Sequence, residues 1–562
     1  MKQKIILISG RICTWKSKLA NKLDVKRGQY RISTSSILKE IANKDGDPTD
    51  RKSLQKLGDR FDIDTDYKWV FDAVSNEASK NSDVKCFVVD HIRHKEQLLH
   101  FRKQNNFEIV HVHLFADPAF LESEFKRRSK GTPQSERETY ASADPLYGNE
   151  ADILWFKKDA DVRLNVTHTD AEDTFVRVCA ALRINPTQRR RCVDVIVGGQ
   201  YGSEGKGNIA AYLSKEYDVL IRVGGPNAGH TVASESGEYT YHQLPSGSKD
   251  CTAEILLGPG MTIDVRKLLK EIKECGITEE RLFIDPDAMI IGLKDKQAER
   301  KLKEGIASTG SGSGAAAARK ITQRDNKVRL AKNILSLAKY VGKGQKPRGS
   351  TLRRLELAYS KNKSILLEGT QGSGLSIFHG PYPHVTSRDT NVAGCIAEAG
   401  ISPARVRRII MVTRTTPIRV ADPDGKRKTS GYLKHPTTFD TIAREAGLEP
   451  SKVKNAEKTS TTNRNRKVGR FDWELFRKSC KLNAPTDIAL TFADYIDSDN
   501  QDAHRYEQLT EDTINFIEEL ELVSQARVTL INTRFPKPND HSNSDLRSLI
   551  DRRNWLGGKT KN

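Results

Sequence analysis

The sequence predicts an α/β protein with two domains, and three observations support this prediction. A strand-like apolar run, a glycine-containing loop and a helix-forming stretch follow one another twice, beginning near residue 4 and again near residue 193. Residues 1–185 alternate strand and helix patterns, which is typical of a parallel sheet with helices on both faces. A short polar and basic segment, residues 186–192, separates the two repeats and has the composition of a linker. We therefore expect a first domain over residues 1–185 and a second that begins at residue 193.

The composition narrows the class of protein. Hydrophobic residues make up 36% and charged residues 30% of the chain, which is typical of a folded, soluble protein. No apolar run reaches the length of a membrane-spanning helix, so we expect no membrane partner. The eight cysteines are scattered without a C-x-x-C pair. This argues against zinc sites and disulfide scaffolds and favours a cytoplasmic location.

The formal net charge of +20 has two interpretations. It provides either a field that gathers nucleotides and other anions or a surface that binds nucleic acid. Basic residues are dispersed apart from Arg189–Arg191, and no nucleic-acid-binding module is recognisable. Nucleotides are therefore the expected partners, and nucleic acid is not.

The loop after the first predicted strand has most of a phosphate-binding motif. It fits G-x-x-x-x-G-K-[ST] except that Trp15 stands where the second glycine belongs. A later apolar strand, residues 86–90, ends in a carboxylate suited to magnesium. Four residues are candidates for phosphate and magnesium contacts: Gly10, Lys16, Ser17 and Asp90. We expect the indole of Trp15 to obstruct the turn of the loop around a phosphate.

The order of features in residues 1–185 resembles that of the nucleoside monophosphate kinases. The phosphate loop comes first, followed by the strand that ends in Asp, arginines at Arg127–Arg128, and a late strand that ends at Asn165. The resemblance implies a P-loop kinase-like parallel sheet. Two functions stay open for this domain: a working kinase, or a degenerate domain that senses nucleotides or serves as a scaffold.

A denser glycine loop, residues 198–207, lies between a predicted strand over residues 193–197 and a predicted helix over residues 208–215. Its glycines let backbone N–H groups approach a phosphate, Lys206 supplies charge, and the helix N-terminus adds its dipole. Gly207 follows the lysine, so no hydroxyl stands there to hold a metal, and the loop is not a standard P-loop. We expect a nucleotide phosphate in this different cradle.

A second glycine-rich turn follows the strand over residues 219–223 and carries His230. The two turns, G-S-E-G-K-G and N-A-G-H-T, resemble the signatures of the adenylosuccinate synthetases. The resemblance implies a larger mixed α/β domain over residues 193–535, with a polar tail over residues 536–562. It also implies a homodimeric, magnesium-dependent ligase that uses a purine nucleoside monophosphate, ATP or GTP, and L-aspartate.

Later motifs extend the resemblance along the second domain. Thr309 and Gly310 open a T-G-S-G-S-G turn, Gln371 lies in E-G-T-Q-G, and Thr386 lies in H-G-P-Y-P-H-V-T-S. The loop over residues 460–466, S-T-T-N-R-N-R, resembles the arginine loop that binds aspartate, and guanidinium groups hold carboxylates in a bidentate way.

The resemblance assigns a role to each matching residue. The implied catalytic residues are His230, Lys206, Ser203 and Gln371. Those implied to bind the substrate nucleotide are Asn227, Thr309, Gly310, Thr386 and Gln371. Those implied to bind aspartate are Thr461, Thr462, Arg464 and Arg466. Those implied to bind the nucleoside triphosphate are Gly202, Glu204, Gly205, Lys206, Gly207, Gly229, His230, Thr231 and Asp494. The implied magnesium ligands are Ser203 and Gly229.

Two positions depart from the family pattern. Ser203 replaces the aspartate that takes the purine N1 proton and binds magnesium, and Phe492 replaces the lysine that lies over the base of the triphosphate. Both departures resemble the phage-associated branch, which acts on dGMP. The substrate therefore stays open between IMP and dGMP, and the donor between ATP and GTP. The alternative is a catalytically impaired protein that senses nucleotides or serves as a scaffold.

Overall fold

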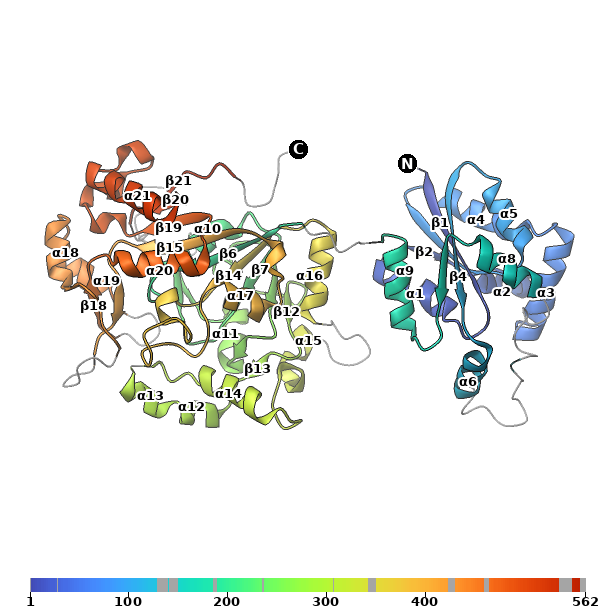
Figure 1. Ribbon diagram of the computed structural model, residues 1–562, viewed down its shortest axis with the longest axis horizontal. Helices are drawn as coiled ribbons and strands as arrows, with labels where there is room; N and C mark the ends of the chain where they lie inside the picture. The colour runs from blue at the N-terminus through green and yellow to red at the C-terminus, as the bar shows by residue number, and fades with distance from the viewer. Residues whose placement is uncertain are drawn as a thin grey trace. The chain divides into compact units, whose positions relative to one another are not determined.

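The computed structural model of the protein divides into two compact units, residues 1–187 (unit 1) and 188–562 (unit 2). It describes residues 2–27, 29–128, 140, 150–184, 190–234, 237–306, 308–341, 350–422, 430–458, 464–534 and 548–555. Each unit has its own central sheet and its own hydrophobic core (Figure 1).

Unit 1 is built on a five-stranded parallel sheet with the order β2-β3-β1-β4-β5. The strands are β1 (Gln3–Gly10), β2 (Tyr30–Ile32), β3 (Cys86–Ile92), β4 (Phe107–Phe115) and β5 (Val162–Asn165). The helices are α1 (Lys16–Arg27), α2 (Thr34–Asp45), α3 (Arg51–Asp64), α4 (Trp69–Lys80), α5 (Lys95–Arg102), α6 (Pro118–Arg128), α8 (Glu150–Asp159) and α9 (Ala171–Ala181).

Helices cover both faces of the unit 1 sheet because successive side chains of β1 point in opposite directions. Ile6 and Ile8 pack in one cluster with residues of α1 and α9. Ile5 and Leu7 pack in another with residues of α4 and α5. The centre of the strand, residues 5–8, is therefore apolar at every position, as a parallel strand buried on both faces requires.

Unit 2 is built on a nine-stranded mixed sheet with the order β12-β10-β7-β14-β6-β15-β19-β20-β21. All neighbouring strands are parallel except the last pair. The strands are β6 (Val193–Gly198), β7 (Val219–Arg222), β10 (Glu254–Leu257), β12 (Leu282–Ile284), β14 (Ile365–Glu368), β15 (Val406–Arg414), β19 (Asp487–Thr491), β20 (Arg527–Asn532) and β21 (Leu549–Asp551).

Smaller sheets and the helices surround this sheet (Figure 1). The short strands are β8 (His230–Ser234), β9 (Gly237–Tyr241), β11 (Thr262–Ile263), β13 (Met289–Ile290), β16 (Ile418–Val420), β17 (Pro436–Thr437) and β18 (Arg466–Gly469). The helices are α10 (Lys206–Ser214), α11 (Val265–Glu274), α12 (Leu293–Ala298), α13 (Arg300–Gly305), α14 (Ser313–Gln323), α15 (Ala338–Val341), α16 (Thr351–Ser360), α17 (Val392–Ala399), α18 (Phe439–Glu445), α19 (Pro450–Ala456), α20 (Trp473–Asn483) and α21 (Glu511–Ser524).

The strand order of unit 2 brings five loops to one edge of the sheet. Strand β6 lies between β14 and β15, and β7 and β19 are the next neighbours on either side. Parallel strands end at the same edge, so the loops that follow all five strands meet there. Open α/β sheets bind ligands in the crevice at this edge.

The stretch predicted as a polar tail contributes to the structure of unit 2. Strand β21 pairs antiparallel with β20. The side chain of Trp555 is buried, and its Nε1 donates to Asp487 Oδ1 at 2.9 Å. Apolar periodicity is too short here to indicate a strand from the sequence. Among the described helices, none is both long and apolar enough to span a membrane.

Candidate active site

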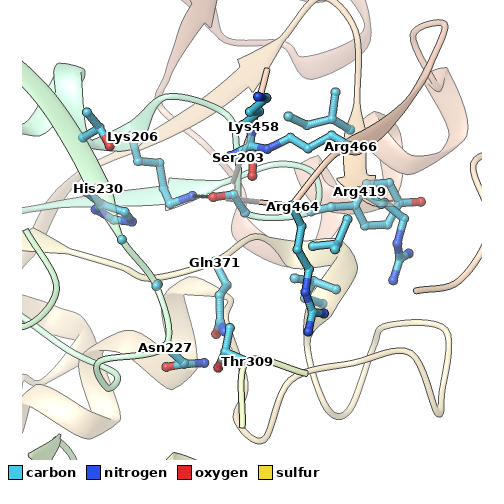
Figure 2. Close-up of a pocket in the computed structure, with 18 of the residues that line it drawn as sticks. Ser203, Lys206, Asn227, His230, Thr309, Gln371, Arg419, Lys458, Arg464 and Arg466 are labelled. Carbon is cyan, nitrogen blue, oxygen red and sulfur yellow. Dashed lines mark hydrogen bonds between the residues drawn. The ribbon is translucent and has the colours of Figure 1, made fainter. Parts of the chain in front are cut away.

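A pocket of about 1510 Å³ lies where the loops of unit 2 meet. Its wall includes residues that follow β6, β7, β14, β15 and β19. Figure 2 shows Lys206 and His230 on one side of the pocket and Arg419 and Arg464 on the other. Of the residues predicted for the second domain, those that line the pocket are Gly202, Ser203, Gly205, Lys206, Gly207, Asn227, Gly229, His230, Thr231, Thr309, Gln371, Thr386, Arg464, Arg466 and Asp494.

Four predicted residues are not in this lining. Glu204 lies behind the glycine loop, and Gly310 follows Thr309 with a φ of +62°. Thr461 and Thr462 fall outside the described residues.

The glycine loop has a conformation that requires glycine at two positions. Gly202 has a φ of +100° and Gly205 a φ of +82°, and α10 begins directly after Gly205. A Cβ on Gly207 would lie 2.8 Å from the Cβ of His230. The loop and the histidine turn therefore pack without space for a side chain between them, as a close cradle requires.

Glu204 shapes this loop rather than facing the pocket. Its carboxylate is fully buried, accepts from the backbone nitrogens of Gln200 and Gly202 at 2.9 and 2.8 Å, and pairs with Lys206 Nζ at 2.6 Å. The predicted direct contact of Glu204 with the triphosphate is therefore replaced by an indirect role. It holds Lys206, which does line the pocket.

His230 is held in one orientation by a buried carboxylate. Its Nδ1 lies 2.5 Å from Glu368 Oε1, and Glu368 also accepts from the backbone and hydroxyl of Ser246. Burial lowers the pKa of His230 to about 4, Arg222 adds to this effect, and Glu368 opposes it. Burial acts to raise the pKa of Glu368, but Arg222 and His230 outweigh it and hold that pKa at about 2. The pair is therefore a carboxylate with a neutral imidazole.

The proton of this neutral imidazole is fixed by its partner. A carboxylate only accepts, so Nδ1 of His230 carries the proton and Nε2 is an acceptor. Nε2 is buried and has no hydrogen-bond partner among the described residues. To donate to an anion, His230 must first take up a second proton.

Neutral polar groups gather at another part of the pocket. Figure 2 places Asn227, Thr309 and Gln371 close together in view, and all three line the cavity. Gln371 has a φ of +63°, and its Oε1 is buried without a partner among the described groups. The amide is thus strained in its backbone and unsatisfied in its side chain, as expected of a group that waits for a ligand.

A carboxylate that the sequence did not indicate connects the arginines of the opposite wall. Glu457 is buried, pairs with Arg414, lies 3.6 Å from Arg466, and accepts from the hydroxyl of Tyr495 at 3.1 Å. Burial acts to raise the pKa of Glu457, but Arg414 and Arg466 outweigh burial and lower this pKa below its ordinary value. Glu457 therefore stays ionised. Glu457 therefore holds Arg466 at the pocket wall.

Asp494 and Phe492 form the wall after β19. Asp494 Oδ2 accepts from Gln501 Nε2 at 3.2 Å, whereas the buried Oδ1 has no partner in the described part of the chain. Burial raises the pKa of Asp494 to about 7. Phe492 has a φ of +59°, and its ring lies 3.9 Å from the guanidinium of Arg414. The arginine thus stacks on the ring that stands in place of the expected lysine.

Seven lysines and arginines line the pocket, and three of them, Lys206, Arg464 and Arg466, were predicted from the sequence. The other four are Arg419, Lys452, Lys458 and Arg534. Arg419 follows β15 in the stretch Thr415–Val420. Among 93 lysines and arginines, no pattern distinguishes it from a solvated side chain.

The predicted magnesium ligands supply neutral oxygens only. Ser203 and Gly229 line the pocket, but the neighbouring carboxylates of Glu204 and Glu368 are already engaged by protein groups. Magnesium usually keeps several waters and binds substrate phosphates with few protein ligands. The residues therefore fit a magnesium ion held mainly by phosphate oxygens and water.

The phosphate loop of unit 1 is closed on itself. Lys16 Nζ donates to the carbonyls of Gly10 and Arg11, the second at 2.8 Å. A Cβ on Gly10 would lie 2.2 Å from the carbonyl oxygen of Leu114, so this glycine is required. Ser17 is exposed.

Trp15 does not obstruct the loop as expected. Its φ of +69° turns the side chain into the core of unit 1, where the indole is buried and Nε1 donates to the Thr169 carbonyl at 3.1 Å. Asp90 is bound on both oxygens, by Arg31 at 2.6 Å and by the backbone nitrogen of Thr34 at 3.3 Å. A left-handed backbone, which the sequence does not indicate for tryptophan, is the reason for the difference.

Comparisons with known proteins agree with the geometry of unit 2. The family model for adenylosuccinate synthetase matches residues 195–338 and 326–501. An adenylosuccinate synthetase of Methanococcus maripaludis is 35% identical over 347 residues, which is 60% of this chain and 95% of that protein. One from Methanocaldococcus jannaschii is 36% identical over 366 residues, or 63% and 97% of the two chains.

Two solved structures are also similar. A succinoaminodeoxyadenylate synthetase of cyanophage S-2L, bound to dGMP and to dATP as an energy donor, is 27% identical with a TM-score of 0.52, covering 65% of this chain and 96% of that one. The fully ligated adenylosuccinate synthetase of Plasmodium falciparum, 23% identical with a TM-score of 0.51, shares the fold over 65% of this chain and 100% of its own. The chain belongs to the adenylosuccinate synthetase family, whose members are carbon–nitrogen ligases.

Proposed function

We propose that this protein joins L-aspartate to C6 of a 6-oxopurine nucleoside monophosphate at the expense of a nucleoside triphosphate. The observation that supports this most is the composition of one pocket, which places a glycine loop with Lys206, an unsatisfied Gln371 and the arginines 464 and 466 around a common space. A triphosphate, a purine nucleotide and a dicarboxylate need these three kinds of group.

The reaction has two balanced steps. The γ-phosphoryl group passes from the triphosphate to O6 of the purine, which breaks a P–O bond and forms another, while the N1 proton of the purine passes to water. The amine of aspartate then attacks C6, a C–N bond forms and the amine gives up a proton to water, and the C6–O6 bond breaks as inorganic phosphate leaves with O6. Phosphoryl transfer depends mainly on positioning and on charge neutralisation, which Lys206 and the backbone amides of the glycine loop supply.

His230 supports the first step as an acid toward the triphosphate. Its bare Nε2 must gain a proton before it can donate to a phosphate oxygen, and Glu368 on Nδ1 stabilises the resulting imidazolium. Binding of the triphosphate therefore takes up a proton at this nitrogen. Magnesium, held by phosphates with Ser203 and the Gly229 carbonyl, supplies further charge neutralisation when bound.

We favour dGMP as the substrate nucleotide. Ser203 is shorter than the aspartate of the family pattern and leaves room for a 2-amino group on the purine. The similar cyanophage enzyme has dGMP bound. IMP is the second candidate, because the archaeal adenylosuccinate synthetases are more similar in sequence, at 35 and 36% identity.

We propose ATP as the donor, with GTP as the alternative. Phe492 lacks the charged group of the lysine that lies over the guanine base in the family pattern. Gln501 donates to Oδ2 of Asp494, so among the described residues only the buried Oδ1 is without a hydrogen-bond partner. One oxygen can accept from one amino group, and adenine has a single amino group. The similar cyanophage enzyme has dATP as its energy donor.

For unit 1 we propose a nucleotide-phosphate site in a kinase-like domain. The parallel sheet, the loop at Gly10 and the lysine that opens α1 support it. A working kinase and a nucleotide-sensing domain differ in turnover, so nucleoside monophosphate phosphorylation by the full chain separates them.

The decisive experiment incubates the full chain with magnesium, L-aspartate and each pairing of IMP, dIMP, GMP or dGMP with ATP or GTP. Mass spectrometry then detects the succinylated nucleotide. Product from dGMP with ATP is the expected result. Product only from IMP would make the protein an ordinary adenylosuccinate synthetase with a substituted loop. No product from any pairing would favour the alternative of a sensor or scaffold.

A further inference from the structure

We infer that Arg419 is a further specificity-determining residue, which binds a carboxylate of the amino-acid substrate together with Arg464 and Arg466. The inference rests on the proposed ligase function. It adds a third guanidinium group to the two that the sequence pattern indicates.

The guanidinium of Arg419 is buried at the pocket wall with one unused nitrogen. The residue is 6% exposed, and its Nη2 donates to the His384 carbonyl at 3.0 Å. Its Nη1 is buried and has no hydrogen-bond partner among the described residues. A buried donor without a partner lowers the stability of the folded state, and more so when it is charged. The position is therefore maintained for a ligand rather than for stability.

The surroundings of Arg419 are built to hold the guanidinium and not to neutralise it. The guanidinium lies 4.3 Å from the ring centroid of Tyr201, and the Tyr201 side chain also hydrogen-bonds it, but a neutral phenol does not balance its charge. A Cβ on Gly431 would lie 2.9 Å from Nη2, so the backbone of this glycine packs directly against the guanidinium. Burial lowers the pKa of Arg419, and the ordinary pKa is high enough that the charge remains.

The described residues offer Arg419 no carboxylate within ion-pair distance. The carboxylate of Asp422, which follows β16, acts to raise the pKa of Arg419, but it lies 3.0 Å from Lys467 Nζ. Arg414, on the same wall, is paired with Glu457. A cation that is fixed, desolvated and unpaired beside a pocket is complementary to an anionic ligand.

The position of Arg419 favours the dicarboxylate among the anions of the reaction. Strands β16 and β18 are antiparallel neighbours, and Val420, the residue after Arg419, pairs with Arg466, so the two arginines lie on adjacent strands of one small sheet. In Figure 2, Arg464, proposed for aspartate, lies between Arg419 and the pair Asn227 and Thr309. Arg419 also bonds His384, two residues from the proposed nucleotide contact Thr386, so the nucleotide phosphate is the alternative anion that the test below separates from aspartate.

The chemistry of the substrate fits three guanidinium groups. Aspartate brings two carboxylates with four oxygens, and each guanidinium can form two parallel N–H···O bonds. Arg466 is partly engaged by Glu457, whereas Nη1 of Arg419 is not engaged by any described group. We assign to Arg419 the discrimination between a dicarboxylic amino acid and its amide or monocarboxylic analogues.

The test compares Arg419→Met and Arg419→Lys with Arg405→Met in the full chain. Arg405 is a matched control, because it is buried at 7% exposure and stacks on Tyr359 at 4.2 Å, yet it does not line the pocket. Steady-state kinetics give separate KM values for L-aspartate, the nucleotide and the triphosphate. Thermal unfolding of each variant reports whether the fold is retained.

For Arg419→Met we expect the KM for L-aspartate to rise about 10- to 100-fold, the range expected from loss of a hydrogen bond to a charged group. The KM values for both nucleotides should change less than about twofold, and Arg405→Met should leave all three unchanged. Arg419→Lys keeps the positive charge but cannot form two parallel hydrogen bonds to a carboxylate. Its KM for aspartate should therefore lie between those of the wild type and Arg419→Met.

A rise in the KM for the nucleotide instead would place Arg419 at the monophosphate and overturn the inference. Unchanged KM values in both variants would also overturn it. If Arg419→Met does not fold, Arg419→Lys decides, since the lysine still fills the space. If the wild type forms no product at all, the proposed function fails by itself. Calorimetric binding of L-aspartate to the wild type and to Arg419→Lys, with nucleotide present, then tests Arg419 separately, and equal affinities would refute its role.

Discussion

The two phosphate loops of this protein follow the same plan but differ in what surrounds their lysines. Lys16 in unit 1 folds back onto the carbonyls of its own loop, and Asp90 is tied to Arg31. Lys206 in unit 2 is held by the buried carboxylate of Glu204 and faces a pocket. A strand, a glycine loop and a lysine therefore do not by themselves decide the form of a site. The groups that the neighbouring strands bring to the same edge decide it.

The largest effect should come from replacing the lysine of each loop in turn. Lys206→Met should lower ligase turnover by about 10³-fold, because it removes the charge closest to the phosphates. It also leaves Glu204 buried and unpaired, at a cost of about 3–5 kcal/mol in the free energy of unfolding. Kinetics and denaturant unfolding measure the two effects. Lys16→Met is the control, and an equal loss of ligation in that variant would mean that the loops act as one site.

The carboxylates of Glu368, at the end of β14, and Asp90, within β3, provide the next comparison. Glu368→Gln keeps the shape of the side chain but removes the charge that stabilises protonated His230, so the ligase kcat should fall about 10²-fold. Asp90→Asn should leave ligation unchanged.

The pH profile of the same variants is informative. The wild type should lose activity as pH rises, because the proton on His230 is needed, and Glu368→Gln should shift that loss to lower pH. A profile that does not move would exclude the role of Glu368 in holding this proton.

Acid stability should also differ between the units. Burial lowers the pKa of His111 to about 3 and that of His113 to about 4, both below the ordinary value near 6.5. The folded state stays neutral there while the unfolded chain binds protons, so stability is constant above about pH 6.5 and falls as pH drops below it.

His111 and His113 together should cost unit 1 about 3 kcal/mol per pH unit between roughly pH 6 and pH 4, and His91, whose pKa burial also lowers, adds to this loss. Burial has a similar effect on His230 and His242 in unit 2, each with a pKa of about 4, but there the core is larger. Hydrogen exchange of the full chain at pH 7 and pH 5 should therefore show β1 opening before β6. The reverse order would contradict this prediction.

The smallest effect concerns the base of the donor. Phe492→Lys should shift the ratio of kcat/KM for ATP and GTP toward GTP by about fivefold, since it restores the lysine that lies over guanine in the family pattern, and a cation over an aromatic base is worth about 1 kcal/mol. Loss of the stack with Arg414 offsets part of this gain. Phe492→Leu lacks the new charge and should leave the ratio near that of the wild type. A ratio unchanged in both variants would remove Phe492 from donor recognition.

The sequence predicted the strands that carry the site and most residues that line it. Strands predicted over residues 193–197 and 219–223 correspond to β6 and β7, because apolar β-branched runs beside glycine are strong local signals. The roles of Glu204 and Glu457 were not predictable. Each acts through partners far along the chain or through the exact turn of a loop, such as Arg414 for Glu457.

Arg419 and Trp15 show the same limit in two ways. Arg419 is one basic residue among many until the pairing of β16 with β18 gives it a position. Trp15 appeared to obstruct a loop because its left-handed backbone has no sequence signal. Local propensity therefore identified the loops, whereas tertiary pairing decided which side chains meet in them.

Glu457 has a consequence for the order of events at the site. One buried carboxylate contacts Arg466 of the amino-acid side, Arg414 behind Phe492, and Tyr495 next to Asp494. A ligand that draws Arg466 toward itself loosens or strengthens the contacts that position the donor base. The affinities for aspartate and for the triphosphate are then thermodynamically linked, and each must change the other by the same factor. Through Glu457, binding of aspartate would thus change the affinity for the triphosphate, and binding of the triphosphate would change the affinity for aspartate.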